Sequence, residues 1–479
     1  MAKILKKTIL LMSFLLLFVS MANAQDNLGK GKSLISSGDY VGALSYLKSA
    51  AASDNSYEAN YYYGLALYKT GSLVDAESYL NKALAKDDEG ILAMQTMGDI
   101  YSTKKQYDKA DTYYKKAIKL DNQNIPLLIS EANNFTAAGK IDDAIKALTL
   151  ATTINKENPP ANIYNGLGDA YYTRRSYVAA IDNYKKALSI DKNNAYAHYG
   201  LGNVYYRQKK YTDALKEYTA STTLNPNFAE GYFESGRLLY FNENYGSSME
   251  AFAKYAQLKP GSTEGEAYIG KVYYAQGKLD EALAKLEDVV SKEPTSNSAN
   301  KYLAYIYIDK KDNAKALSYF QKVPEDVLEV EDILQYARLY TANGDSMKAF
   351  SYYDKALKLD STDEMIYYEM AKAYYAKKNY TAARENFQKS IDLGITNIGA
   401  YLGEGVADYE MGNYDQAMAE FHKMEDIDPK YTLSYFYEGM VSLKQNKRDD
   451  AIKYFNKVLE IEPDNKDAKD ILNQLNNQK

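Results

Sequence analysis

The sequence predicts an all-α fold, a solenoid of antiparallel helix pairs, from three observations. A glycine-rich segment at residues 166–172 returns in similar form at 200–206, 34 residues later. Within a copy, apolar or small residues recur from Tyr164 to Tyr171 at i, i+3, i+4 and i+7, which is one helix face. Many copies end near a proline such as Pro226, and proline cannot continue a helix. Because a single helix pair cannot bury its apolar face, the copies are expected to stack.

Each copy carries a small residue, here called the marker, and a second small residue twelve positions later. The markers are Gly31, Gly64, Gly98, Ala132, Gly168, Gly202, Gly236, Gly270, Ala304, Ala337, Ala371, Gly405 and Gly439. The second small residues are Ala43, Ala76, Ala110, Ala144, Ala180, Ala214, Ser248, Ala282, Ala316, Ala349, Ala383, Ala417 and Ala451. The pattern therefore predicts about 13 copies, each with a first helix, a turn and a second helix.

This pattern resembles the tetratricopeptide repeat family, whose unit is a 34-residue helix–turn–helix. The resemblance covers essentially the whole chain after residue 24 and implies a right-handed superhelical solenoid. The sequence departs from the family at the tryptophan that usually stands four residues before the marker, because this chain has no Trp. Tyrosine occupies that place in five copies: Tyr164, Tyr232, Tyr367, Tyr401 and Tyr435.

Residues 1–24 have the pattern of a secretory signal. Lysines begin the segment, an apolar run from Thr8 to Met21 follows, and Ala22-Asn23-Ala24 is a small-x-small cleavage site. The alternative is a membrane anchor, but the run is short for a bilayer span. We expect cleavage after Ala24 and export to an extracytoplasmic bacterial compartment: the periplasm, the outer membrane surface or the medium. No later segment is apolar enough to span a bilayer.

The remaining chain divides at its irregular points into 25–160 (copies 1–4), 161–330 (copies 5–9), 331–465 (copies 10–13) and a 466–479 tail. Pro159-Pro160 inserts two residues, and Pro324 should end the second helix of the ninth copy early. We interpret both as bends in one solenoid. The tail is predicted to be a capping helix over the last copy. Its apolar stripe comprises Ala468, Ile471, Leu472 and Leu475.

The composition argues against an enzyme, a cofactor or a metal. The chain has no Cys, and its two histidines, His198 and His422, lack a partner at ligand spacing. Gly166-x-Gly168 lacks the third glycine of a dinucleotide loop, where Tyr171 stands, and lies within a predicted helix. A net charge of −6 argues against a nucleic-acid surface. The prediction is a non-enzymatic protein without catalytic, cofactor or metal sites.

The resemblance places a partner in a concave groove lined by first helices. The candidate positions lie one, four and five residues after the markers of copies 5–8. They comprise the tyrosines Tyr172, Tyr206, Tyr240 and Tyr274, the polar residues Asp169, Asn203, Arg237 and Lys271, and beside them Arg207 and Phe241. Tyrosine offers a large, rigid contact area and a hydroxyl at little entropic cost. The alternative is that these tyrosines only brace neighbouring first helices.

The sequence therefore predicts a scaffold or adaptor that holds a peptide or a partner protein, of unknown identity, in this groove. Two other classes remain open. A tyrosine-lined groove also suits a glycan-binding module, and a solenoid also suits an accessory or regulatory subunit of an envelope enzyme or secretion complex. Binding to a glycan array without any partner protein would distinguish the first alternative from a scaffold.

Overall fold

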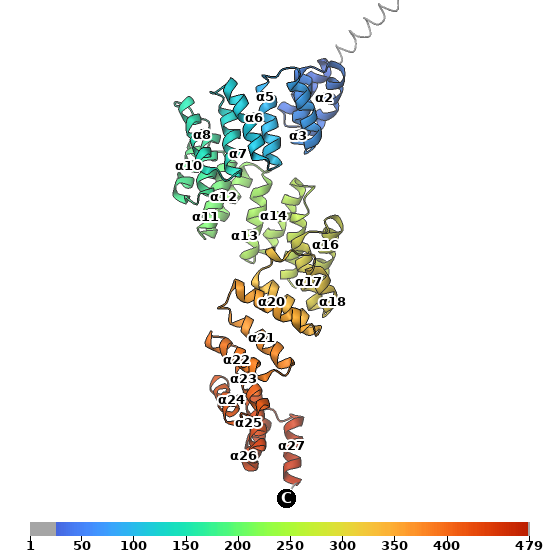
Figure 1. Ribbon diagram of the computed structural model, residues 1–479, viewed down its shortest axis with the longest axis vertical. Coiled ribbons are helices and arrows are strands. Elements are labelled where there is room, and N and C mark those ends of the chain that lie inside the picture. The colour runs from blue at the N-terminus through green and yellow to red at the C-terminus, as the bar shows by residue number, and fades with distance from the viewer. Residues whose placement is uncertain (1–24, 478–479) are drawn as a thin grey trace, which may run out of the picture. The chain divides into compact units, whose positions relative to one another are not determined.

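The computed structural model describes residues 25–477, and the described part is built from helices without a β-strand (Figure 1). The chain forms two compact units, Met1–Lys259 and Pro260–Lys479. The predicted signal, residues 1–24, lies outside the described residues. The boundary between the units falls inside the predicted 161–330 group, and the three-part division of the copies stays a prediction.

The first unit begins with helical residues 25–36 and continues with alternating first and second helices. They are α2 (Tyr40–Asp54), α3 (Tyr57–Lys69), α4 (Leu73–Leu84), α5 (Ile91–Thr103), α6 (Tyr107–Leu120), α7 (Ile125–Ala137), α8 (Ile141–Ile154), α9 (Ala161–Thr173), α10 (Tyr177–Ile190), α11 (Ala195–Arg207), α12 (Tyr211–Leu224), α13 (Ala229–Phe241) and α14 (Tyr245–Leu258). From α3 onward, odd-numbered helices are first helices, and each packs against the even-numbered helix that follows it.

The second unit repeats this order. Its helices are α15 (Glu264–Ala275), α16 (Leu279–Lys292), α17 (Asn297–Asp309), α18 (Asn313–Phe320), η1 (Glu325–Val327), α19 (Val330–Ala342), α20 (Ser346–Leu359), α21 (Glu364–Ala376), α22 (Tyr380–Asp392), α23 (Ile398–Met411), α24 (Tyr414–Ile427), α25 (Thr432–Lys444), α26 (Arg448–Ile461) and α27 (Lys466–Asn477). Within this unit, first helices also contact one another, as α21 contacts α19 and α23. The predicted all-helical fold of paired repeats is confirmed.

The small residues of the repeat lie where the helices of a pair meet. Every second small residue, from Ala43 to Ala451, is fully buried. A Cβ atom built on Gly168 would lie 2.5 Å from the Tyr184 ring. A large side chain of the second helix fills the space that the glycine leaves, so the marker accommodates a side chain of its own pair.

The turn between the two helices of a copy uses a left-handed residue seven positions after the marker. That residue is glycine in some copies, such as Gly139 with φ 75°, and lysine in others, such as Lys209 with φ 60°. The left-handed conformation costs an L-residue roughly 1–2 kcal/mol, and glycine avoids this cost. The turn geometry is therefore retained even where the sequence does not favour it.

The structure confirms the early end of the second helix in the ninth copy and the helical tail, and the bends at the two proline sites stay a prediction. Pro160 caps α9 after a connection that starts at Asn155, and α18 ends at Phe320, before Pro324. With 8 residues, α18 is shorter than the 14-residue α16. The tail forms α27, which packs against α26 (Figure 1). Its predicted stripe contacts the core of the last copy: Ala468 and Leu472 are buried, and Ile471 and Leu475 are half-buried.

Candidate functional site

The candidate partner-binding residues lie on four first helices at equivalent places in the repeat. Those of the first unit are Asp169 and Tyr172 on α9, Asn203, Tyr206 and Arg207 on α11, and Arg237, Tyr240 and Phe241 on α13. Lys271 and Tyr274 lie on α15, in the second unit. The groove itself stays a prediction.

The tyrosines of the first unit brace their own helix pairs. Each ring contacts the first tyrosine of the following second helix, and each side chain is partly buried. The ring centroids are 6.1 Å apart for Tyr172–Tyr177, 5.7 Å for Tyr206–Tyr211 and 5.9 Å for Tyr240–Tyr245. These contacts support the interpretation that the tyrosines brace the fold. In the first unit they join the first and second helix of one pair, whereas the expectation was bracing between neighbouring first helices.

Tyr274 makes a different contact within the second unit. Its ring lies 5.6 Å from Tyr302 and 6.2 Å from Tyr305, both on the next first helix, α17. The Lys271 ammonium lies over the same Tyr302 ring, 5.4 Å from its centroid. Here the bracing does run between first helices, as the alternative interpretation expected.

The fold itself uses two of the polar candidates. Tyr184 and Tyr196 donate hydrogen bonds of 2.6 and 2.8 Å to the two carboxylate oxygens of Asp169. Burial raises the pKa of Asp169 to about 6, although both hydroxyls favour the charged form. Tyr218 likewise donates a 2.8 Å hydrogen bond to Asn203. Asp169 is therefore held by hydrogen bonds from its own second helix and from the next first helix, and Asn203 by one from its own second helix.

The two arginines and the phenylalanine among the candidates differ in how far their side chains are exposed. Arg237 pairs with Glu234 at 2.9 Å, and its guanidinium lies 5.7 Å from the centroid of the Tyr206 ring. Arg207 is exposed, and its Nε donates a 3.1 Å hydrogen bond to the Tyr172 hydroxyl. Phe241, at the same repeat position on α13, is 61% exposed. Arg207 and Phe241 are thus the candidates that the fold leaves most accessible.

A second set of functional candidates was missed from the sequence: buried glutamates directly before the marker. Glu131, Glu404 and Glu438 hold this position in three copies, and each is less than a tenth exposed. Burial, the largest cause, raises the pKa of Glu131 and of Glu404 to about 7. It also raises the pKa of Glu438, with the neighbouring Glu425 adding to the shift. The sequence did contain a signal for this set: in these three copies a glutamate stands directly before the marker, where other copies have residues such as Met97.

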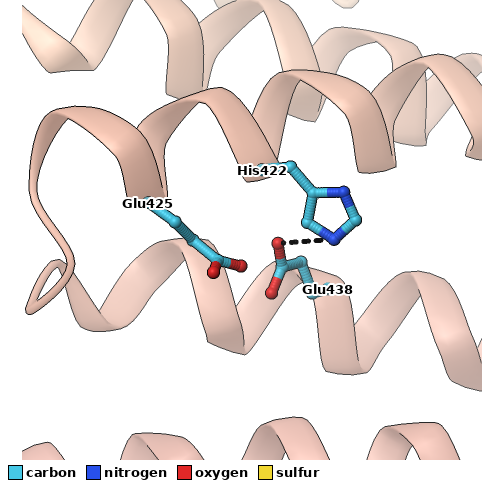
Figure 2. Close-up of side chains that lie close together, drawn as sticks. All are labelled: His422, Glu425 and Glu438. Atoms are coloured by element: carbon cyan, nitrogen blue, oxygen red, sulfur yellow. Dashed lines mark ion pairs between the residues drawn. The ribbon is translucent and has the colours of Figure 1, made fainter.

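Glu438 belongs to a three-residue cluster between the last two copies. Figure 2 shows His422 and Glu425 on one helix, α24, directed toward Glu438 on α25. His422 Nε2 lies 3.4 Å from Glu438 Oε1 and 3.5 Å from the Tyr454 hydroxyl. A cavity of about 560 Å³ lies beside the cluster and is lined in part by His422, Glu425 and Tyr454.

The structure revises the sequence interpretation of the histidines. His198 pairs with Glu217, its Nδ1 lying 2.6 Å from the carboxylate, which agrees with a packing role. His422 was taken as a residue without a ligand-spaced partner, because its partner Glu438 comes from another helix. Sequence spacing along one helix could suggest only Glu425, three residues away.

No helix within residues 25–477 is long and apolar enough to cross a membrane.

The stacked helix pairs define a helical-repeat protein, and comparison with known families identifies the repeat. Models described as "Tetratricopeptide repeat" match residues 28–91, 92–124, 195–228, 269–326, 334–398 and 432–465, and one described as "TPR repeat" matches residues 168–209. The chain belongs to the tetratricopeptide repeat family. Proteins of this family are typically non-enzymatic scaffolds that bind partner proteins.

Individual relatives are distant. A Protein CTR9 homolog of Arabidopsis thaliana is 26% identical over 98 residues, which are 20% of this chain and 9% of that protein. The chain thus spans less than a tenth of that relative.

Solved structures also resemble the chain. The Cut9-Hcn1 hetero-tetramer of the APC/C has 16% identity and a TM-score of 0.48, covering 96% of this chain and 92% of that chain. Yeast Tom70 has 15% identity and a TM-score of 0.34, with coverage of 88% and 96%. MamA has 26% identity and a TM-score of 0.28, with coverage of 34% and 94%. The family assignment rests on the repeat matches.

Proposed function

We propose that this protein is a non-enzymatic scaffold that binds a peptide or partner protein along its first helices, with Arg207 and Phe241 as principal contacts. One observation carries the proposal. The two side chains hold the same repeat position on α11 and α13, and both are exposed although the tyrosines beside them pack into their helix pairs. The family membership supports a protein partner rather than a small substrate.

The chemistry of this surface defines the partner. An exposed phenylalanine stabilises a complex by burying apolar area, and aromatic and arginine side chains dominate interface energies. Arg207 offers further N–H donors beside the one directed at Tyr172, and a guanidinium matches a carboxylate in geometry. The surface therefore suits a segment that carries an apolar side chain near an acidic one.

We also propose that the scaffold acts outside the cytoplasm of a bacterium, in the periplasm or at the outer membrane surface. The support is the charged, apolar and small-x-small order of residues 1–24. Sequencing the N-terminus of the protein recovered from cells tests this. A mature chain starting at Gln25 is expected, and a cytoplasmic chain that keeps Met1 would refute the proposed compartment.

Affinity capture from extracts of the source cells tests the scaffold function. The bait is the mature chain, and the comparison is a double variant, Arg207→Ala with Phe241→Ala. Val178→Ala is the matched control, because Val178 is an exposed apolar residue, 74% exposed, on a second helix of the same unit. The double variant should lose a specific partner that the control retains. Equal capture by all three proteins would refute this surface as the site.

A glycan array distinguishes the scaffold from the alternative function, a glycan-binding module. Direct binding of the purified chain to a defined sugar, reduced in the double variant, would favour a glycan-binding module that uses the same surface. The scaffold proposal predicts no such binding.

A further inference from the structure

The cluster of His422, Glu425 and Glu438 has the composition and the geometry of a metal-ligand set. His422 and Glu425 are three residues apart on α24, so they lie on one helix face. Glu438 faces them from α25 (Figure 2). One ligand atom from each residue lies within 4.8 Å of the others. The set bridges two neighbouring copies within the second unit.

Glu438 is the residue that points to a ligand. Its side chain is fully buried, and no group outside the cluster donates a hydrogen bond to either carboxylate oxygen among the described residues. Its polar neighbours are the other two members of the cluster, His422 Nε2 at 3.4 Å and the Glu425 carboxylate. A buried carboxylate that lacks further hydrogen bonds is unfavourable unless it is neutralised, paired or bound to a metal. The carboxylate of Glu425 stands beside it, which makes an unneutralised cluster more unfavourable still.

Equivalent glutamates in other copies lie near side chains that carry a permanent positive charge. Glu404, one copy earlier, also lacks a hydrogen bond to either carboxylate oxygen among the described residues, but it lies 3.7 Å from the Arg384 guanidinium, and Lys423 also offsets its charge. The charge of Glu131 is offset by Lys115. Lys115 holds the same repeat position as His422, seventeen residues after its marker. At Glu438 the chain thus has an imidazole where another copy has an ammonium, and an imidazole nitrogen can coordinate a metal ion.

We propose that His422, Glu425 and Glu438 bind a divalent transition-metal ion, with Zn²⁺ the best chemical match. One imidazole nitrogen and two carboxylate oxygens suit Zn²⁺, which also accepts a water as its fourth ligand. The adjoining cavity has room for that water. Mg²⁺ and Ca²⁺ prefer sites made only of oxygen ligands.

The distances are compatible with a bound ion. Ligands held about 2.0–2.2 Å from one Zn²⁺ stand roughly 3.0–3.6 Å apart, and the 3.4 Å between His422 and Glu438 already lies in that range. Glu425, which is only partly buried, closes the remaining gap by a side-chain rotation. Lys457, which also lines the cavity, pairs with Glu460 at 2.8 Å, so its charge is compensated.

A bound ion would join the second helix of copy 12 to the first helix of copy 13. These two helices are otherwise held by side-chain packing between neighbouring copies. An ion that binds only the folded state stabilises that state in proportion to its occupancy. The proposed role is therefore a metal link that fixes the last copies of the solenoid.

Isothermal titration of the untagged, chelator-treated full chain with ZnCl₂ tests the proposal. The wild type should bind Zn²⁺ at one saturable site per chain, and millimolar MgCl₂ should not compete. Both His422→Ala and Glu425→Gln should weaken this binding at least about tenfold. His422 is half exposed, so its truncation should leave the fold intact, which circular dichroism verifies.

Glu404→Gln is the matched control. Glu404 holds the repeat position of Glu438 one copy earlier, where the Arg384 guanidinium lies near the carboxylate. The variant should retain wild-type zinc binding. Absence of a saturable site in the wild type, or wild-type affinity in both His422→Ala and Glu425→Gln, would overturn the proposal. Hydrogen exchange gives a second readout: Zn²⁺ should slow exchange in α24 and α25 of the wild type and leave it unchanged in His422→Ala.

Discussion

The Tyr184 hydroxyl donates a 2.6 Å hydrogen bond to Asp169, fifteen residues earlier on the first helix of the same pair. The equivalent bonds join Tyr114 to Asp99 at 2.7 Å and Tyr218 to Asn203 at 2.8 Å. In each case the acceptor directly follows the marker glycine, and the tyrosine ring fills the space beside that glycine. The marker, the acceptor and the tyrosine therefore act together to close the helix pair.

Asp169→Asn should change how stability depends on pH. The pKa of Asp169 is raised from its ordinary value of 3.8 to about 6, so the folded chain holds a proton there that the unfolded chain releases. This contribution is fully present below about pH 4 and is lost as the pH rises through 6. The stability of Asp169→Asn relative to wild type should therefore rise between pH 4 and pH 7, by on the order of 2 kcal/mol.

Thermal melts at several pH values measure this difference. Asn203→Asp is the converse variant, because it places a carboxylate where Tyr218 donates, and it should lose stability relative to wild type as the pH rises. A difference between Asp169→Asn and wild type that stays constant from pH 4 to pH 7 would contradict the assigned environment of Asp169.

Gly202→Ala should destabilise the first unit. A Cβ atom at Gly202 would lie 2.5 Å from the Tyr218 ring, so the ring would have to move. Overpacking of this kind costs about 1–3 kcal/mol. Gly246→Ala makes the same chemical change in helix α14, where a Cβ meets nothing within 4 Å, and should be neutral or stabilising. Equal melting midpoints for the two variants would show that the assigned repeat register is wrong.

Lys209→Gly should stabilise the turn between α11 and α12. Lys209 has φ 60°, and glycine removes the strain of that conformation while losing more freedom on folding. The net gain should be about 0.5–1 kcal/mol, measured by chemical denaturation. Lys216→Gly, at an exposed position inside α12, should instead cost about 1 kcal/mol. The free energy of unfolding should therefore rise in Lys209→Gly and fall in Lys216→Gly, and a change in the same direction would contradict the strain assigned to Lys209.

Leu472→Asp should loosen the last copy. Leu472 is 7% exposed and lies in the core shared by α25, α26 and α27. The substitution removes the apolar contacts of the leucine and places a carboxylate where water does not hydrate it. Hydrogen exchange should quicken in α25 and α26 and stay unchanged in the first unit, because a solenoid transmits stability through neighbouring copies. Asp470→Ala, on the exposed face of α27, is the control. Unchanged exchange in Leu472→Asp would contradict a capping role.

The repeat pattern was sufficient to predict the helix pairs, because the marker and the second small residue are spaced by backbone geometry alone. It also located the early end of α18, since Pro324 acts locally. The apolar stripe that includes Leu472 predicted the capping helix for the same reason: helical periodicity alone defines one face. These features depend on residues close to one another in the sequence.

The site could be predicted only in part. The pattern located Tyr206 and Arg207 on one helix, but it did not show that Tyr206 contacts Tyr211 while Arg207 stays exposed. Side-chain packing across a pair decides that difference. The proximity of His422 to Glu438 likewise depends on how α24 crosses α25, and no spacing along a single helix contains that information.

Binding of the captured partner, or of a peptide taken from it, to purified protein tests the central claim most directly. Its affinity is measured for the wild type, for Arg207→Ala with Phe241→Ala, and for Val178→Ala, with a thermal melt of each protein. The scaffold proposal predicts at least about tenfold weaker binding by the double variant, wild-type affinity for Val178→Ala, and closely similar melts. Wild-type affinity in a natively folded double variant would contradict the proposal, because the partner would then contact another surface.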